Sequence, residues 1–203
     1  MLFLNLYFCE FMAIIETSKK QRIMEAAAKL FRDRGYSATS MRDLAKAVHL
    51  QASSLYSHIN SKQEILKDIC FQNAHHFLAG IEQIEKEGRT PREQIRQLIF
   101  LHLDIATSDA TSITAFNDEW RHLEEPDLGQ FIKLRKRYEN RFLGIIQQGI
   151  DQGTFKDMDP TISMYTILSS LRWVYDWYQA GKTTSIQDIG EQITNIVLAG
   201  IEK

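Results

Sequence analysis

Apolar residues recur along the chain at intervals of three and four positions, the spacing of one face of an α-helix. No stretch alternates between apolar and polar residues with the period of two that a half-buried strand shows. The pattern therefore predicts an all-α fold. We expect about nine helices, over residues 18–34, 40–47, 51–59, 61–87, 91–107, 110–123, 127–151, 160–180 and 185–202.

Local signals mark the ends of these helices. A Ser, Thr or Asp side chain at the N-cap accepts hydrogen bonds from amides that helix geometry leaves unpaired, so such residues locate helix starts. Starts are predicted at Ser18, Ser40, Ser61, Thr90, Asp159 and Ser185, and stops at Gly35, Gly88, Gly153 and Gly181. No repeat, low-complexity tract or flexible linker interrupts the series.

The stretch from Ser40 to Lys62 contains two short helices only a few residues apart, which indicates a helix-turn-helix. The first helix has an apolar stripe of Leu44, Ala45 and Val48, and the second is anchored by Leu50, Leu55 and Ile59. The other face of the second helix carries the short side chains of Gln51, Ala52, Ser53, Ser54 and Ser57. Side chains of this size suit the floor of a DNA major groove.

Charge is divided unevenly along the chain. The net charge is −2, but residues 18–63 carry nine basic and three acidic residues, a net charge of +6, which leaves −8 on the remainder. DNA phosphates attract the first segment and repel the second. A solvated basic helix face would be an equal alternative if the helix-turn-helix pattern were absent.

At these residues the sequence resembles the TetR/AcrR family of repressors. The positions that match the family pattern are Phe31, Gly35, Tyr36, Thr39, Leu44, Ala45, Ala47, Leu55, Tyr56, His58, Ser61, Lys62, Glu64 and Leu66. His49 replaces the usual turn glycine, Leu50 a valine and Ile59 a phenylalanine. Histidine is among the more tolerated non-glycine residues at positive φ, so His49 is compatible with the turn.

The resemblance implies an N-terminal extension at 1–17, a three-helix helix-turn-helix domain at 18–63 that binds DNA, and a helical ligand-binding and dimerisation domain at 64–203. It implies that Arg42, Ala52, Ser53, Ser54 and Ser57 face bases, that Thr39, Tyr56, His58 and Lys62 hold phosphates, and that Ser40 and Gln51 complete the DNA-binding set. Lys62 falls in the first turn of a helix, where amide donors already favour an anion. His58 has an alternative role as a wedge between helices, and Tyr56 as a mainly packed side chain.

The remainder of the chain has no catalytic motif. It lacks a G-x-S-x-G elbow, a phosphate-cradling glycine loop and an H-E-x-x-H pair, and the adjacent His75 and His76 diverge by about 100° on a helix. We therefore predict neither an enzyme nor a resident metal or cofactor. A helical protein-interaction module is disfavoured by the basic N-terminal segment.

Aromatic and basic residues are frequent in the predicted ligand-binding domain and suit a pocket between helices, although a filled core explains any single aromatic residue. The ligand-binding candidates are Phe100, Phe116, Trp120, Arg121, Arg137, Tyr138, Arg141, Trp173 and Trp177. The stretches 119–142 and 171–193 resemble the ligand domain of family members that respond to acyl-CoA thioesters. The alternative inducer is a lipophilic cation, which would prefer a carboxylate such as Asp118 or Glu119.

The last two predicted helices have apolar stripes that exceed what one domain easily covers. The residues expected at a dimer interface are Ile162, Tyr165, Leu168, Ile186, Ile189, Ile193 and Val197. The alternative is a hairpin buried within one subunit. The resemblance implies a homodimer that binds a palindromic double-stranded DNA operator and is released by a small-molecule inducer.

The sequence favours the cytoplasm and no membrane. Cys9 and Cys70 are too few for a disulfide framework. The apolar stretch 2–15 has no preceding Lys or Arg, is interrupted by Asn5 and Glu10, and falls short of the roughly 20 residues that span a bilayer. We interpret it as adventitious, with Met12 as the expected start. The alternative is a functional N-terminal arm.

Overall fold

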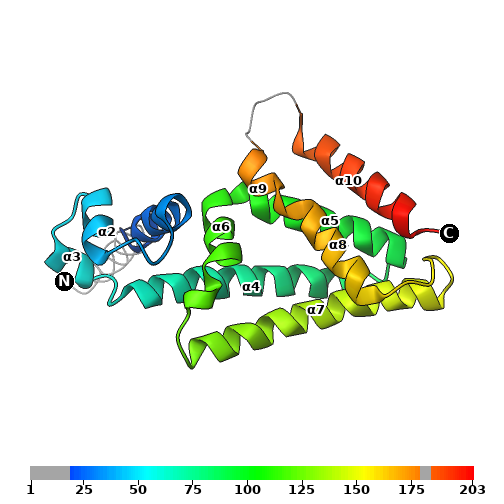
Figure 1. The fold of residues 1–203 in the computed structure, drawn as a ribbon, viewed down its shortest axis with the longest axis horizontal. Helices are drawn as coiled ribbons and strands as arrows, with labels where there is room; N and C mark the ends of the chain where they lie inside the picture. Colours follow the sequence, from blue (N-terminus) through cyan, green and yellow to red (C-terminus); the bar gives the residue numbers. More distant parts are fainter. Residues whose placement is uncertain (1–18, 179–183) are drawn as a thin grey trace, which may run out of the picture. The chain divides into compact units, whose positions relative to one another are not determined.

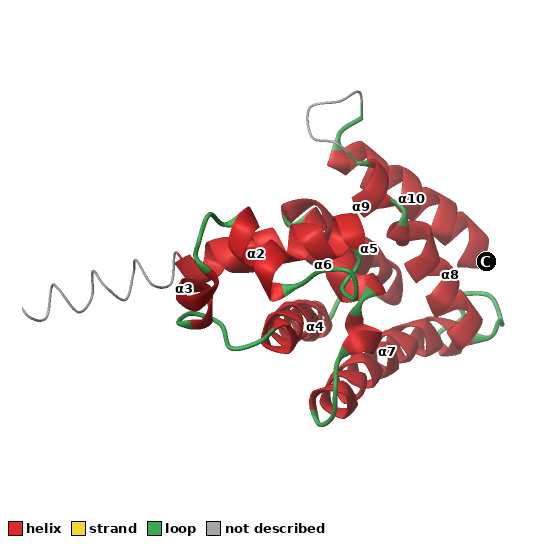
Figure 2. Cartoon of the chain, turned by 60° about the vertical axis from the view of Figure 1, so that its left-hand side comes forward, coloured by secondary structure: helices red, strands yellow, loops and turns green. Residues whose placement is uncertain are grey.

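The structure is a computed structural model that describes residues 19–178 and 184–203 (Figure 1). Within these ranges the chain consists of helices and loops, with one isolated bridge pair between Phe155 and Glu202 and no strand (Figure 2). The predicted all-α fold is therefore confirmed. Ser18, Gly181, Cys9 and the apolar stretch 2–15 lie outside the described residues.

The helices agree closely with the predicted series. A helix over residues 19–34 is followed by α2 (Met41–Ala47), α3 (Ala52–Tyr56), α4 (Lys62–Lys86), α5 (Pro91–Ser108), α6 (Ala110–Asp118), the 3₁₀ helix η1 (Trp120–His122), α7 (Asp127–Asp151), α8 (Pro160–Arg172), α9 (Val174–Trp177) and α10 (Ile186–Ile201). Two predicted helices are each divided: 110–123 into α6 and η1, and 160–180 into α8 and α9, with a break at Trp173.

The capping signals explain these boundaries. Ser40 and Thr90 each form a reciprocal capping box, with Asp43 and Glu93 respectively. The side chains of Asp159 and Ser185 also accept N-cap hydrogen bonds, as predicted. Gly35, Gly88 and Gly153 have φ angles of 84°, 63° and 72°, the left-handed backbone that glycine adopts without steric cost where a helix stops.

The chain divides into two compact units. The first contains the chain up to Phe71 together with Thr114–Leu128, and the second contains Gln72–Ile113 and Gly129–Lys203. This division differs from a simple boundary after residue 63, because the first unit includes the end of α6, η1 and the loop that follows. The core of the first unit is formed by fully buried side chains, among them Ile23, Phe31, Leu44, Leu55 and Ile59.

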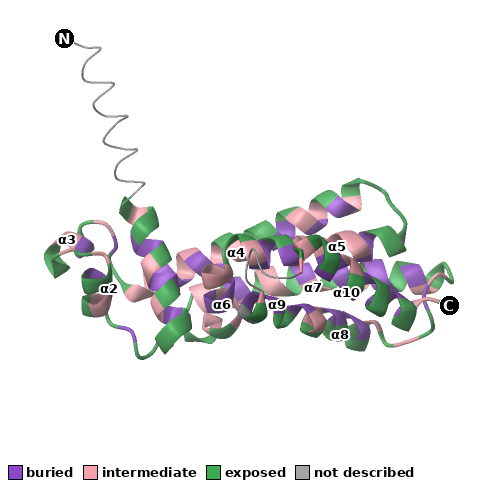
Figure 3. Cartoon of the chain, turned by 90° about the horizontal axis from the view of Figure 1, so that it is seen from above, coloured by how far each residue is buried: buried purple, intermediate pink, exposed green. Residues whose placement is uncertain are grey.

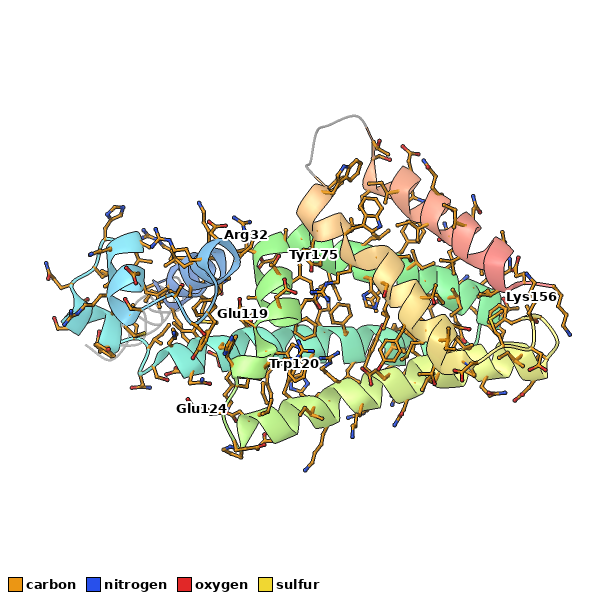
Figure 4. The ribbon with its side chains drawn as sticks, in the orientation of Figure 1. Arg32, Glu119, Trp120, Glu124, Lys156 and Tyr175 are labelled. Carbon is orange, nitrogen blue, oxygen red and sulfur yellow. The ribbon has the colours of Figure 1, made fainter. Side chains whose placement is uncertain are left out.

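In the second unit, α7 runs alongside α4, and α10 packs against α5 and α8 (Figure 1). The approach of α10 to α5 is close because Gly190 has no side chain: a Cβ there would lie 2.5 Å from the Phe100 ring. Lys156, labelled in Figure 4, donates to the carbonyl of Gly200 at 2.9 Å and holds the last turn of α10. Among the described residues, no helix combines the length and apolarity needed to cross a bilayer.

Candidate DNA-binding surface and ligand-domain residues

The helix-turn-helix presents a polar face built on a buried framework. Leu44 of α2 and Leu55 of α3 are both completely buried, so the two helices are fixed against the rest of the first unit. His49 occupies the turn between them with φ 56°, the left-handed conformation that a turn glycine usually adopts. Because Leu55 points inward, the opposite face of α3 points to solvent. The exposed residues of α2, α3 and their flanks are Ser40, Arg42, Lys46, Ala47, His49, Gln51, Ala52, Ser53, Tyr56 and Ser57.

Two of the expected phosphate contacts are turned inward. Thr39 is only 2% exposed, and its hydroxyl donates to the carbonyl of Gly35 at 2.9 Å. Lys62 donates from Nζ to the carbonyls of Tyr36 at 2.8 Å and Thr39 at 2.7 Å. Its ammonium also lies 4.0 Å from the centroid of the Tyr36 ring. These contacts make Thr39 and Lys62 supports of the loop between the first helix and α2.

Burial supports this description of Lys62. Desolvation is the main cause that lowers the pKa of its ammonium, and Glu119 acts in the opposite direction. Burial likewise raises the pKa of Tyr36 to about 12. The position of Lys62 in the first turn of α4 matched the family pattern, but the sequence could not show that two carbonyls of a preceding loop would face its Nζ.

The remaining predicted DNA contacts differ in accessibility. Tyr56 is 51% exposed, so its ring is not mainly packed, whereas His58 and Ser54 are half-buried. Lys46 was not among the predicted contacts, although it lies one turn after Arg42 on α2 and is exposed. The signal that could have found Lys46 is the i, i+4 spacing, which places two cations on one face of a helix.

Segment 114–128 completes the first unit. The imidazole of His122 stacks on the Tyr36 ring with centroids 5.2 Å apart, and the His122 carbonyl accepts a hydrogen bond from Gln63 Nε2 at 2.6 Å. Lys67 of α4 forms an ion pair with Asp127 at 2.9 Å. The labels in Figure 4 show that Glu119, Trp120 and Glu124 also come from this segment.

Three predicted ligand residues therefore belong to the first unit and six to the second. Phe116 and Trp120 are half-buried in the first unit, and the guanidinium of Arg121 lies 4.6 Å from the Trp120 ring centroid. In the second unit, Phe100 contacts α10 and is covered by the Arg96 guanidinium at 4.7 Å. The predicted set is thus not one cluster within either unit.

The most distinctive polar pair in the second unit is His102 of α5 with Tyr138 of α7. His102 Nε2 and the Tyr138 hydroxyl are 2.7 Å apart, and Phe77 and Phe142 surround them at ring-centroid distances between 4.6 and 6.2 Å. Burial lowers the pKa of His102 to about 4 and raises that of Tyr138, so both groups are neutral at pH 7. His102 was not predicted, since a single histidine in an apolar helix carries no spacing signal.

The other aromatic candidates lie at the break between α8 and α9. Trp173 is 45% exposed and Trp177 is 56% exposed, and their rings meet edge to face with centroids 5.2 Å apart. Exposed tryptophans are unusual on a protein surface that has no partner or ligand.

The dimer candidates separate into two groups. Ile162 and Tyr165 of α8 are 69% and 48% exposed, and Leu168 and Ile186 are half-buried. Ile189, Ile193 and Val197 of α10 are each at most 9% exposed in the single chain, because they pack within the second unit. Figure 3 shows both buried and exposed bands on α10. The exposed band contains Ile196, which is 74% exposed and was not predicted.

No group of three or more His, Cys, Asp or Glu side chains is arranged to hold a metal ion in the ranges that the structure describes. The fold and the exposed face of α3 instead define a helix-turn-helix DNA-binding protein.

Comparison with known proteins identifies the family. A family profile described as "Tetracyclin repressor-like, C-terminal domain" matches residues 88–201, and one described as "Bacterial regulatory proteins, tetR family" matches residues 23–69. The chain therefore belongs to the TetR family of bacterial regulatory proteins. Its members are regulators of transcription and not enzymes, which agrees with the prediction from the sequence.

Individual relatives cover almost the whole chain. The HTH-type transcriptional repressor KstR2 of Mycolicibacterium smegmatis is 26% identical over 91% of this chain and 91% of its own length. The structure of the ketosteroid transcriptional regulator KstR2 of Mycobacterium tuberculosis matches with a TM-score of 0.84 at 26% identity, covering 91% of this chain and 95% of that one. AibR, solved with isovaleryl coenzyme A and operator DNA, matches with a TM-score of 0.76 at 23% identity over 88% and 97% of the two chains.

Proposed function

We propose that this protein is a homodimeric cytoplasmic repressor that binds a palindromic operator and releases it when an acyl-CoA thioester binds. The observation that carries the proposal is the exposed face of α3, which presents small polar side chains. The buried side chains of Leu44 and Leu55 hold this helix in place. Such a face approaches base edges without steric conflict. The repressor name of the KstR2 relatives supports the direction of regulation.

The DNA contacts divide into bases and phosphates. The residues that face bases are Arg42, Gln51, Ala52, Ser53, Ser54 and Ser57. The residues that contact the DNA phosphate backbone are Ser40, Tyr56 and His58, and we add Lys46 to this second set. Thr39 and Lys62 contribute indirectly, because their polar groups hold the loop before α2. Two copies of this surface, related by a two-fold axis, read the two halves of a palindrome.

Dimerisation uses the exposed apolar band of α8 and α10. Ile162, Tyr165 and Ile196 are large side chains that the single chain leaves in water, and the two helices that carry them pack against each other. Burial of this surface against a second copy provides a hydrophobic driving force. Ile189, Ile193 and Val197 serve the interface indirectly by holding α10 on the second unit.

An acyl-CoA inducer fits the second unit better than a lipophilic cation. The His102–Tyr138 pair provides neutral hydrogen-bonding groups among aromatic rings, which suits the thioester end of an acyl chain. The cations of α7 and the exposed tryptophans suit the polar remainder of the ligand. Of the two carboxylates considered for a cation, Glu119 lies with Oε2 3.4 Å from Nε2 of His122, within the first unit.

A binding experiment tests this function. Operator DNA is first selected from a random pool with the purified protein, and its affinity is then measured by fluorescence anisotropy with and without a series of acyl-CoA thioesters. We expect an inverted repeat bound by two chains, and release that depends on the acyl group. Release by lipophilic cations and not by any thioester would refute the proposed inducer. Recovery of no preferred sequence would refute the repressor itself.

A further inference from the structure

The turn between α2 and α3 carries a histidine that the function described above does not use. His49 has a φ of 56°, at the position where the family pattern has glycine. A side chain in this conformation costs conformational energy that glycine avoids. Residues held in such sparsely populated backbone conformations are most frequent at sites that bind a ligand or switch. The turn therefore presents an imidazole at a cost to its own stability.

The backbone of this turn is fixed on both sides of His49. The amide of His49 donates to the carbonyl of Lys46 at 3.2 Å, and the amide of Leu50 donates to the carbonyl of Ala45 at 2.9 Å. The two helices that the turn connects pack against each other (Figure 1). The side chain of His49 is exposed, and its ring forms no hydrogen bond or ion pair with the residues that the structure describes. Both ring nitrogens are therefore available to a ligand.

The neighbours of His49 indicate which ligand this is. The exposed residues on either side of it include Lys46, which we assign to a phosphate, and Gln51, which we assign to bases. A side chain between a phosphate contact and a base contact lies near the phosphates that border the groove. The ligand with the right chemistry at this position is therefore the phosphate backbone of DNA.

The charges around the turn leave the imidazole without an acidic partner. From Leu44 to Gln63 the chain contains no Asp or Glu. Asp43 lies in the first turn of α2, where its carboxylate accepts from the amide of Ser40 at 3.0 Å. The charged and titratable groups on the elements that meet near the turn are Arg32, Asp33 and Arg34 of the first helix, Arg42, Asp43 and Lys46 of α2, Tyr56 of α3 and His58 after it. None of the described carboxylates forms an ion pair with His49, so a phosphate would be the first counter-ion of its charged form.

We propose that protonated His49 binds a phosphate of the operator, so that operator binding takes up a proton at this position. Histidine is the side chain whose ordinary change of charge falls between pH 5 and 8. A phosphate beside an imidazole favours the charged form, and by linkage a lower pH favours the DNA-bound protein. Affinity for the operator should therefore rise as the pH falls from 8 to 6. The inference rests on the proposed function, since it adds a residue to the operator contacts.

This contact compensates for a cation that is turned inward. The ammonium of Lys62 donates to the carbonyls of Tyr36 and Thr39, so it is not directed at DNA. A charged imidazole in the turn returns one phosphate contact to each half of the operator. Unlike a lysine, it does so only at pH values where histidine is protonated.

The dependence of operator affinity on pH and salt tests the proposal. Affinity of the full chain for its selected operator is measured by fluorescence anisotropy at pH 6 and pH 8, over a range of salt concentrations. We expect about tenfold tighter binding at pH 6, roughly threefold for each of two chains, which is the size of an exposed charge contact. The slope of log affinity against log salt should be steeper at pH 6 by about one unit for each chain.

Variants of the turn assign this effect to one residue. His49→Gly removes the imidazole and relieves the backbone, so it should fold at least as stably as the parent protein and lose most of the gain at pH 6. His49→Asn, which tolerates positive φ and takes up no proton, should behave in the same way. His49→Lys carries a permanent charge, so at pH 8 it should bind about as tightly as the parent protein does at pH 6.

The matched control is a histidine outside the first unit. His76 is exposed on the part of α4 that belongs to the second unit, so His76→Gln should leave the dependence on pH and salt unchanged. His58 also titrates and is an expected phosphate contact. The decisive quantity is therefore the difference between the parent protein and His49→Gly, measured at both pH values.

Failure of this inference and failure of the proposed function give different results. Equal dependence on pH and salt in the parent protein and in His49→Gly would overturn the inference and leave operator binding intact. A changed base preference in His49→Gly, with an unchanged salt slope, would also overturn it, because His49 would then contact a base. If the parent protein prefers no duplex at either pH, the proposed function is wrong and the inference fails with it.

Discussion

The two compact units use their cations in opposite ways. In the first unit, Lys62 of the family pattern is turned inward and its ammonium is bound by two carbonyls, which fixes a loop. In the second unit, Lys133 and Lys136 of α7 project outward beside arginines that are oriented by glutamates. A basic residue in a motif is thus not by itself an anion contact. Whether such a residue can bind an anion depends on whether its N–H groups already donate to acceptors within the protein.

The largest expected effect tests the inward lysine. Lys62→Ala removes two hydrogen bonds from a charged donor and a cation–π contact, so it should lower the free energy of unfolding by about 2 to 4 kcal/mol. Urea denaturation measures this loss. The matched control is Lys46→Ala, which removes an exposed lysine and should leave stability nearly unchanged.

DNA binding distinguishes the same two lysines. If Lys46 contacts a phosphate, Lys46→Ala should reduce the dependence of log affinity on log salt by about one unit, whereas Lys62→Ala should keep the slope in the molecules that remain folded. A reduced slope for Lys62→Ala without loss of stability would show that Lys62 turns outward to bind DNA, as its position in α4 first suggested.

The second effect concerns the interior of the second unit. His102 has a folded pKa of about 4, below the unfolded value of about 6.5, so the unfolded chain binds the proton first as the pH falls. The stability contributed by neutral His102 is present above pH 6.5 and is lost between about pH 6.5 and 4. The difference between the two pKa values limits this loss to about 3 kcal/mol. Solvent reaches the half-buried His102 ring and screens part of its charge, so the loss should lie below that limit.

Thermal denaturation across this pH range tests the effect, with His102→Gln as the comparison because glutamine can still bond to Tyr138. The variant should lose less stability than the parent protein on acidification. Parallel curves would show that His102 is readily protonated in the folded protein.

Base recognition by Arg42 gives an effect on DNA binding alone. Arg42 is exposed on α2, so Arg42→Ala should leave the unfolding free energy unchanged while it lowers affinity for the selected operator by about 1 to 3 kcal/mol and relaxes sequence preference. Competition between operator and single-base variants measures this. Identical discrimination before and after the substitution would remove Arg42 from the base-reading set.

The smallest effect concerns the turn. His49 holds a left-handed backbone with φ 56°, which glycine adopts without steric strain, so His49→Gly should stabilise the first unit by about 1 kcal/mol. Chemical denaturation at neutral pH measures the change. A loss of stability would mean that contacts of the imidazole outweigh the strain.

The sequence predicted local structure better than it predicted the ligand site. Ser40 and Thr90 located helix starts because an N-cap bond depends on residues three positions apart. The break at Trp173 carried no such signal. His102 and Tyr138 meet across 36 positions, and Glu82 orients Arg137 across 55, so neither contact follows from local spacing. Burial of Thr39 likewise depends on the loop around it.

The assembly of the first unit from two distant stretches has a practical consequence for chimeras between regulators. A helix-turn-helix domain grafted as residues up to 63 alone would lack His122, whose ring stacks on Tyr36 and whose carbonyl accepts a hydrogen bond from Gln63. A functional graft needs the stretch after α6 as well. For the same reason, substitutions at residues 119–127 should alter operator affinity, because this stretch contacts Tyr36 and Gln63 within the first unit.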